Sequence, residues 1–213
     1  PSGALAALTP LLSQEPIAPA ARWMAGRYFG LMRDYAEAAV QFALAVEGDP
    51  SLSHVEFDIG GRVVRLADVQ GSKWAANVLE EFARGTYNLA ALTVAPGDTV
   101  LDIGAHIGGV SIILAVMHPD VRIVAYEPAS ANYASLVRNL AANGITNVTP
   151  VQQAVMAEHG EMTITWSANA TAGSTVGLSA EAREAREQCG WSSETVQCVT
   201  LDEVFETHGI TRC

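Results

Sequence analysis

The stretch of residues 99–127 constrains the fold more than any other part of this 213-residue chain. An apolar run, Thr99–Ile103, leads into the glycine-rich residues 104–109, and a second apolar run, 121–126, ends at the acidic Glu127. A strand, a tight turn, a helix and a second strand in this order predict a βαβ unit with parallel strands. A carboxylate at the tip of the second strand is typical of a nucleoside pocket, where it accepts hydrogen bonds from ribose hydroxyls.

The spacing of the turn residues distinguishes between the nucleoside ligands that this pocket could bind. A dinucleotide fingerprint is G-x-G-x-x-G, because the pyrophosphate must lie against bare backbone at a helix N-terminus. Here His106 takes the place of the second glycine, and Asp102, Gly104 and Gly108 give D-x-G-x-x-x-G. This spacing favours a ligand with a charged amino-acid tail and no phosphate, such as S-adenosyl-L-methionine. An NAD(P)-dependent oxidoreductase stays open as an alternative.

Three segments together resemble the FkbM family of S-adenosylmethionine-dependent methyltransferases, over about residues 80–212. They are VLDIGAHIGGVS (100–111), YEP (126–128) and TVQCVTLDEVF (195–205). The chain departs from the family at His106, where Asn is usual, and at Asn88, where Glu usually follows the tyrosine. The resemblance implies a Rossmann-like class I methyltransferase core of α/β class, S-adenosyl-L-methionine as cofactor, and O-methylation of a hydroxyl on a small molecule, a sugar or a natural product.

The resemblance also implies which residues bind the cofactor. Asp102 would hold the loop or the ammonium group, Glu127 the ribose, and the residues after a third strand, 148–154, the adenine edge. The full set of expected cofactor-binding residues is Asp102, Gly104, Ala105, His106, Gly108, Glu127, Pro128, Gln153 and Ala154. His106 is the one candidate for a catalytic base, although its default interpretation is a loop residue that acts through its backbone. Asn132 and Asn139 are interpreted as surface and packing residues of the following helix.

Three segments organise the chain: residues 1–52, 53–95 and 96–213. The first is expected to be helical and to resemble a tetratricopeptide repeat over 17–50. The residues that match the small, aromatic and terminating positions of that repeat are Gly26, Phe29, Tyr35, Ala38, Phe42, Ala45 and Pro50,. The second segment predicts a β-hairpin over 54–66 that turns at Gly60 and Gly61, followed by an amphipathic helix over 72–84.

The last segment predicts strands at 99–103, 121–126 and 148–154, and helices at 181–188 and 201–207. A hairpin is expected around Glu158-His159-Gly160, and residues 166–177 are expected to form a surface loop that could cover a substrate,. The resemblance places the first strand at the centre of a larger sheet whose fourth strand follows residue 213. We therefore expect the core to be truncated before that strand and residues 1–213 alone to be inactive.

The amino-acid composition limits the classes of molecule that this protein could bind. Twelve Lys and Arg against 23 Asp and Glu give a net charge of −11, which disfavours nucleic-acid binding,. No apolar run is long enough for a membrane span, and three cysteines without metal-ligand spacing indicate reduced thiols and a cytoplasmic protein without a metal site,. A protein partner could bind the helical repeat. A protein-interaction module with a degenerate nucleotide fold is therefore the second alternative.

Overall fold

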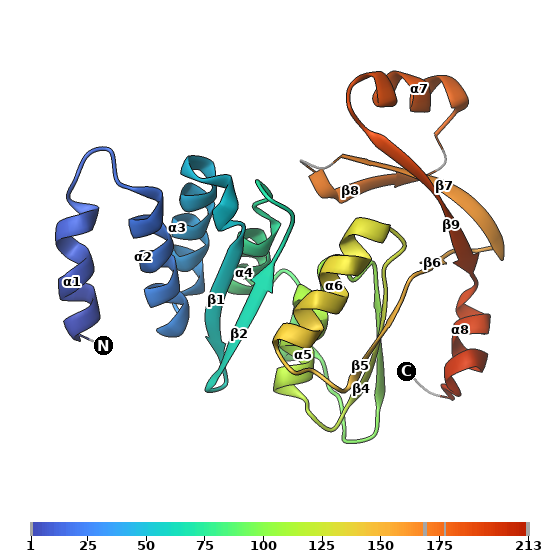
Figure 1. Cartoon of the computed structure of the whole chain (residues 1–213). Helices are drawn as coiled ribbons and strands as arrows, with labels where there is room; N and C mark the ends of the chain where they lie inside the picture. Colours follow the sequence, from blue (N-terminus) through green and yellow to red (C-terminus); the bar gives the residue numbers. More distant parts are fainter. Residues whose placement is uncertain (1, 168–169, 177, 212–213) are drawn as a thin grey trace. The chain divides into compact units, whose positions relative to one another are not determined.

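The computed structural model describes residues 2–167, 170–176 and 178–211. The chain divides into two compact units, Pro1–Thr93 and Val94–Cys213, and each is described by itself (Figure 1). The helical segment and the β-hairpin segment expected from the sequence both lie in the first unit. No helix within the described ranges is long and apolar enough to cross a membrane.

The first unit is built from helices around one short β-hairpin. Its elements are α1 (Ser2–Leu12), α2 (Pro19–Leu31), α3 (Tyr35–Gly48), the 3₁₀ turn η1 (Pro50–Leu52), β1 (His54–Ile59), β2 (Arg62–Ala67), α4 (Trp74–Arg84) and the 3₁₀ turn η2 (Leu89–Ala91). The predicted hairpin is confirmed: β1 and β2 are antiparallel, and Gly60 and Gly61 form the two-residue turn with φ of 62° and 93°,. The helix expected over 72–84 is confirmed from Trp74 onward.

The pair α2 and α3 confirms the expected helical hairpin, while its identity as a tetratricopeptide repeat stays a prediction. Asp34 caps α3 by accepting a hydrogen bond from the backbone N–H of Glu37,. Gly26 lets the two helices approach, because a Cβ there would lie 2.8 Å from Cδ1 of the fully buried Phe42. Gly30 brings β1 close to α2 in the same way, since its Cβ would meet the carbonyl oxygen of Glu56 at 2.6 Å.

The second unit contains a three-stranded parallel sheet in the order β3-β4-β5. Its elements are β3 (Thr99–Ile103), α5 (Gly109–Met117), β4 (Arg122–Tyr126), α6 (Ser130–Ala142) and β5 (Val148–Val151). This arrangement confirms the α/β class and the Rossmann-like βαβαβ order. Side chains alternate between the two faces of β4. Val124 and Tyr126 pack with Val204 of α8 (Leu201–His208), while α5 and α6 are the crossover helices of the sheet (Figure 1).

A second sheet of four strands, in the order β6-β9-β7-β8, corrects part of the sequence-based prediction. Its strands are β6 (Ala154–Val155), β7 (Gly160–Ser167), β8 (Ala170–Val176) and β9 (Ser192–Val199), and the helix α7 (Ala180–Gln188) precedes β9. The expected single strand over 148–154 is wrong, because the chain leaves the first sheet after Val151 and joins the second at Ala154.

The hairpin expected around Glu158-His159-Gly160 is also wrong. Strands β6 and β7 do not pair with each other, because β9 lies between them, parallel to β6 and antiparallel to β7. The surface loop expected over 166–177 is instead the end of β7 and the whole of β8, apart from residues 168–169 and 177, which lie outside the described residues. The helices expected at 181–188 and 201–207 are confirmed, and α7 has no buried residue.

Replacing Gly26 by Ala should destabilise the first unit. The added methyl group would overlap the ring of Phe42, and overpacking of this kind costs about 1–3 kcal/mol,. Gly3 is the matched control, because a Cβ there meets nothing within 4 Å and Ala is the better helix former by up to about 1 kcal/mol,. Urea unfolding of both variants measures the difference. Equal stability of G26A and wild type would contradict the close packing of α2 on α3.

Candidate functional site

The loop between β3 and α5 folds over the carboxyl end of β4. The backbone N–H groups of Gly104 and Ala105 both donate to the carbonyl oxygen of Tyr126, at 2.8 and 2.9 Å. The N–H of Gly108 then donates to the carbonyl of Ala105 at 2.8 Å, which closes the turn. The two strand ends and the loop therefore meet at one edge of the sheet, where ligands bind in open α/β folds.

Three residues of this loop have a left-handed backbone, with φ of 83° at Gly104, 53° at His106 and 85° at Gly108. The two glycines differ in their surroundings. A Cβ on Gly108 would lie 2.5 Å from Cδ1 of Leu136, so this glycine serves the packing of α6. A Cβ on Gly104 would meet nothing within 4 Å, so this glycine faces open space that a ligand can enter. Histidine and asparagine both tolerate the left-handed region better than most residues, which explains how His106 can replace the usual Asn.

Glu127 is the polar centre of the site. Its side chain is buried, with 5% relative exposure, and accepts three hydrogen bonds. The backbone N–H of His106 donates to Oε2 at 2.8 Å, while the N–H of Ala129 and Nδ2 of Asn132 donate to Oε1 at 2.9 and 3.3 Å. Burial raises the pKa of Glu127, an effect that these hydrogen bonds partly offset. A carboxylate has about four acceptor positions, so it can accept a further donor.

Asp102 is the second carboxylate of the site, and it is half-buried. It is the fourth residue of the strand β3, and its Oδ2 accepts a hydrogen bond of 2.6 Å from Oγ of Ser111, near the start of α5. Burial raises the pKa of Asp102 as well, against the opposing effect of the Ser111 hydroxyl. The charge of Asp102 contributes to the raised pKa of Glu127. Two desolvated carboxylates that act on each other favour a cationic ligand and are typical of functional sites.

The helix α6 supplies polar side chains that the sequence interpretation did not assign to the site. Asn132 and Asn139 are buried, and they lie seven residues apart, on one face of the helix,. Asn132 donates to Glu127, and Nδ2 of Asn139 donates to the carbonyl oxygen of Ile107 at 2.9 Å. Asn139 therefore holds the loop of residues 104–108 directly, and Asn132 holds it through Glu127. Their seven-residue spacing, and the hydroxyl of Ser111 on an otherwise apolar helix, were the available signals.

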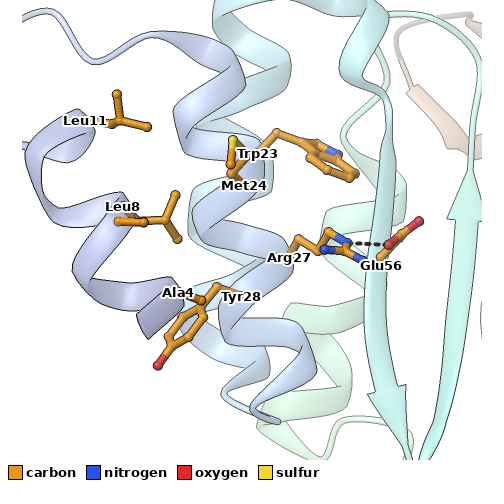
Figure 2. A pocket seen from close by; sticks show the side chains of 9 residues that line it. Ala4, Leu8, Leu11, Trp23, Met24, Arg27, Tyr28 and Glu56 are labelled. Atoms are coloured by element: carbon orange, nitrogen blue, oxygen red, sulfur yellow. Dashed lines mark hydrogen bonds and ion pairs between the residues drawn. The ribbon is translucent and has the colours of Figure 1, made fainter. Parts of the chain in front are cut away.

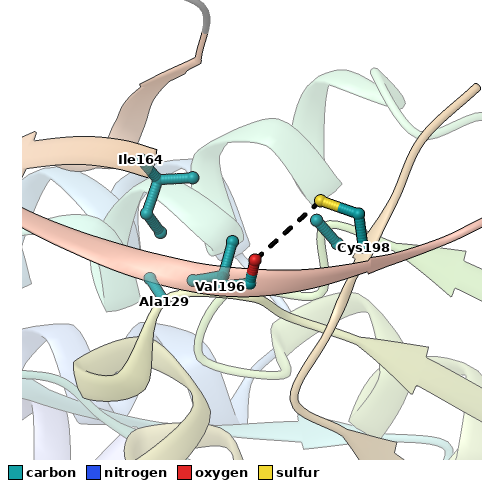
Figure 3. Packing of buried hydrophobic residues seen from close by; sticks show 5 residues of the cluster. Ala129, Ile164, Val196 and Cys198 are labelled. Atoms are coloured by element: carbon teal, nitrogen blue, oxygen red, sulfur yellow. Dashed lines mark hydrogen bonds between the residues drawn. The ribbon is translucent and has the colours of Figure 1, made fainter. Parts of the chain in front are cut away.

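The remaining predicted residues, Pro128, Gln153 and Ala154, follow the ends of β4 and β5 along the chain. Pro128 follows Glu127 directly, and Gln153 lies half-buried in the short connection between β5 and β6. Ala154 pairs with Cys198 in the ladder of the second sheet. Its side chain is buried in a small core with Ala129, Ile164, Val196 and Cys198 (Figure 3). A role of Gln153 and Ala154 at the adenine edge stays a prediction.

His106 contributes its backbone to the site through the hydrogen bond to Glu127. Its imidazole is half-buried, and its role as a catalytic base stays a prediction. Among the residues that the structure describes, no group of three or more His, Cys, Asp or Glu side chains could hold a metal ion.

Two comparisons of the sequence lead to methyltransferases. Residues 83–164 match the profile of the family described as precorrin methyltransferase domain. The methyltransferase sdnD of Sordaria araneosa is 33% identical over 98 residues, which are 46% of this chain and 37% of sdnD. The chain thus matches little more than a third of the length of this curated relative.

Solved structures give more distant similarities. TYW2 of M. jannaschii, solved in complex with AdoMet, has a TM-score of 0.35 and 16% identity, covering 53% of this chain and 64% of that one. The methyltransferase FkbM from Methylobacillus flagellatus has a TM-score of 0.32 and 16% identity, covering 66% of this chain and 35% of that one.

Replacing Asp102 by Asn should stabilise the second unit at neutral pH. A raised pKa means that the folded state favours the protonated carboxyl, so this contribution to stability is complete below the ordinary pKa of 3.8 and lost as the pH rises through the folded-state value,. Asn has the same shape, stays uncharged and can accept the Ser111 hydrogen bond. We expect the free energy of unfolding of D102N to exceed that of wild type at pH 7, and the difference to shrink as the pH falls.

Urea unfolding at a series of pH values measures this difference. The matched control is the exposed Asp120, for which Asp120→Asn should leave the stability nearly unchanged,. A D102N variant that is less stable than wild type at pH 7, or whose advantage does not depend on pH, would contradict the burial of an uncompensated charge at this strand end.

Proposed function

We propose that the second unit binds S-adenosyl-L-methionine and that the protein is an S-adenosylmethionine-dependent methyltransferase. The observation that carries this proposal is the loop of residues 104–108. The backbone N–H of His106 in this loop donates to the buried carboxylate of Glu127, and Gly104 in the same loop faces open space. The matches to the precorrin methyltransferase domain and to sdnD support it from the sequence side.

The residues fit this cofactor chemically. Its sulfonium and ammonium groups are cationic, and a cation relieves the electrostatic penalty of the two desolvated carboxylates, Asp102 and Glu127,. Glu127 has acceptor capacity for a ribose hydroxyl, and the bare backbone at Gly104 allows close approach,. We assign the methionine end to Asp102 and the loop residues Gly104, Ala105, His106 and Gly108. The nucleoside end is assigned to Glu127, Pro128, Gln153 and Ala154.

When bound, the cofactor supplies an electrophilic methyl group on its sulfonium. The protein then contributes mainly by positioning, because holding an activated donor and an acceptor in line replaces a bimolecular encounter. In this chain, Asn132, Asn139 and Ser111 keep the loop and the two carboxylates in place. His106 is our candidate for steering or deprotonating an acceptor hydroxyl.

The finer assignment rests on the resemblance to the FkbM family. We infer an acceptor that is a small hydroxylated molecule, a sugar or a natural product, and transfer to oxygen. The departure from the family at His106 falls in the loop that we assign to the methionine end, so this position is the first to vary in substrate screens.

Calorimetry tests the cofactor. We expect S-adenosyl-L-methionine and S-adenosyl-L-homocysteine to bind, and NAD not to bind, because His106 stands where a pyrophosphate needs a glycine. Binding of NAD alone would establish the oxidoreductase alternative. Binding of none of the three to the folded protein would overturn the proposal and favour an interaction module.

Replacing Glu127 by Ala should weaken S-adenosyl-L-methionine binding by more than about 1.5 kcal/mol, because a charge-assisted contact in a buried pocket is lost,. Asn132→Ala removes one hydrogen bond to the carboxylate but keeps the charge, so it should cost less. The exposed Glu184→Ala serves as the control for net charge. Unchanged affinity in a folded E127A variant would remove the ribose assignment.

Replacing Gly104 by Val should abolish cofactor binding. The branched side chain would occupy the open space that the ligand needs and would resist a φ of 83°,. Gly97→Val is a close control, because Gly97 has a φ of 87°, also meets nothing within 4 Å, and lies in the turn before β3. Both variants carry the same backbone strain, and only G104V should lose affinity in calorimetry. Equal affinity of the two would show that this loop does not hold the cofactor.

A further inference from the structure

The turn that connects β4 to α6 is packed against the second sheet. Ala129, in this turn, is 1% exposed and belongs to a small apolar core with residues of β6, β7 and β9 (Figure 3). Two of these residues, Val196 and Cys198, alternate along β9 and therefore lie on one face of the strand,. Glu194 precedes them with the same spacing, so it lies on the face of β9 that packs on this turn,.

Glu194 binds the first residue of α6. Its Oε1 accepts a hydrogen bond from the backbone N–H of Ser130 at 3.0 Å, across 64 positions of the sequence. The first N–H groups of a helix have no partner within the helix, and the positive end of the helix dipole favours an acid there. The N-cap residue of α6 itself, Ala129, makes no capping hydrogen bond with its side chain. An acid from the second sheet therefore caps this helix.

Glu127 binds the neighbouring N–H group of the same turn. Its Oε1 accepts from the N–H of Ala129 at 2.9 Å and from Nδ2 of Asn132 at 3.3 Å, and its Oε2 accepts from the N–H of His106. A carboxylate has about four acceptor positions, so these three donors leave about one for a ligand. Without Glu194, the N–H of Ser130 would compete for that position.

We propose that Glu194 is a positioning residue for cofactor binding. By accepting the N–H of Ser130, it keeps the remaining acceptor position of Glu127 free for a ribose hydroxyl and fixes the turn that follows Glu127. Glu194 acts through this turn and not by contact with the ligand. The inference rests on the proposed function, because it takes Glu127 as the ribose-binding residue. It extends the binding machinery from the parallel sheet to β9 of the second sheet.

Calorimetry of the whole chain with S-adenosyl-L-homocysteine and with its 2′,3′-dideoxy analogue tests the proposal. We expect Glu194→Ala to weaken the first ligand about fivefold, because one hydrogen bond that acts on Glu127 is lost. The analogue has no ribose hydroxyls, so its affinity should stay nearly unchanged. Glu194→Gln keeps an acceptor oxygen and should restore most of the affinity. A merely structural role of Glu194 would weaken both ligands equally.

Two control variants accompany this titration. Glu161 accepts a hydrogen bond from Nε2 of Gln197 at 2.6 Å within the second sheet, so Glu161→Ala removes an acid of the same sheet without changing the α6 turn. Glu56 joins a helix to a strand in the first unit, since Nε of Arg27 donates to its Oε2 at 2.6 Å beside the cavity between α1 and α2 (Figure 2). Glu56→Ala therefore measures the effect of a comparable loss of packing elsewhere. We expect both variants to bind the two ligands as wild type does.

Amide hydrogen exchange of the ligand-free protein provides the second arm. The N–H groups of Ser130 and His106 should exchange faster in E194A than in wild type, because Glu127 is drawn from the loop toward the helix end. The same groups should exchange at the wild-type rate in E161A. If E194A fails to fold by circular dichroism, Glu194→Asp replaces it, since the shorter side chain keeps the charge but does not reach Ser130.

The outcomes separate this inference from the proposed function. An E194A affinity for S-adenosyl-L-homocysteine equal to that of wild type or E56A, an equal loss for the two ligands, or unchanged exchange at His106 would each overturn the inference. A folded wild-type protein that binds neither S-adenosyl-L-methionine nor S-adenosyl-L-homocysteine would overturn the proposed function. The exchange rate of His106 would then still decide whether Glu194 holds the turn.

Discussion

The buried carboxylate of Glu127 is the interaction on which the geometry of the second unit depends. A charge in this position is costly to desolvate, by several kcal/mol, unless donors surround it. Its three donors come from the loop after β3, from the turn before α6 and from α6 itself. Moving any of these three elements would remove one of the donors of the buried carboxylate. The loop of residues 104–108 is therefore held in place by its hydrogen bond to this carboxylate.

The local elements could be predicted from the sequence because their signals are local. The turn at Gly60 and Gly61, the cap at Asp34 and the glycine-rich loop at 104–108 each depend on residues within a few positions of one another. The second sheet could not be predicted in this way. Strand β9 inserts between β6 and β7 from more than 30 residues further along the chain, in register Gly160 to Cys198. A turn signal at Glu158-His159-Gly160 contains no information about pairing with a strand that lies much further along the sequence.

The site was predictable where a topological rule applied. The carboxyl ends of parallel strands meet at one edge, so Asp102 and Glu127 follow from the strand positions alone. The supporting residues do not follow from such a rule. Ser111, Asn132 and Asn139 lie on helices, where a polar side chain usually faces water, and only the burial of that face makes them part of the site. The sequence pattern places Ala154 at the end of the third strand. The strand in fact ends at Val151, because the next residues pair with the distant β9, and no local signal indicates this pairing.

The glycines of this protein show why the sequence alone does not distinguish a glycine required for packing from one that leaves space for a ligand. Only glycine fits at positions 26 and 108, because a Cβ would overlap a neighbouring side chain, Phe42 at position 26 and Leu136 at position 108. A Cβ on Gly104 would have no neighbour, and this glycine lies in the turn that follows Asp102, in the loop that is bonded to Glu127. In the sequence, Gly104 and Gly108 look equivalent, since both fit one motif. The structure assigns Gly108 to the attachment of α6 and leaves Gly104 as the position where backbone and ligand can meet.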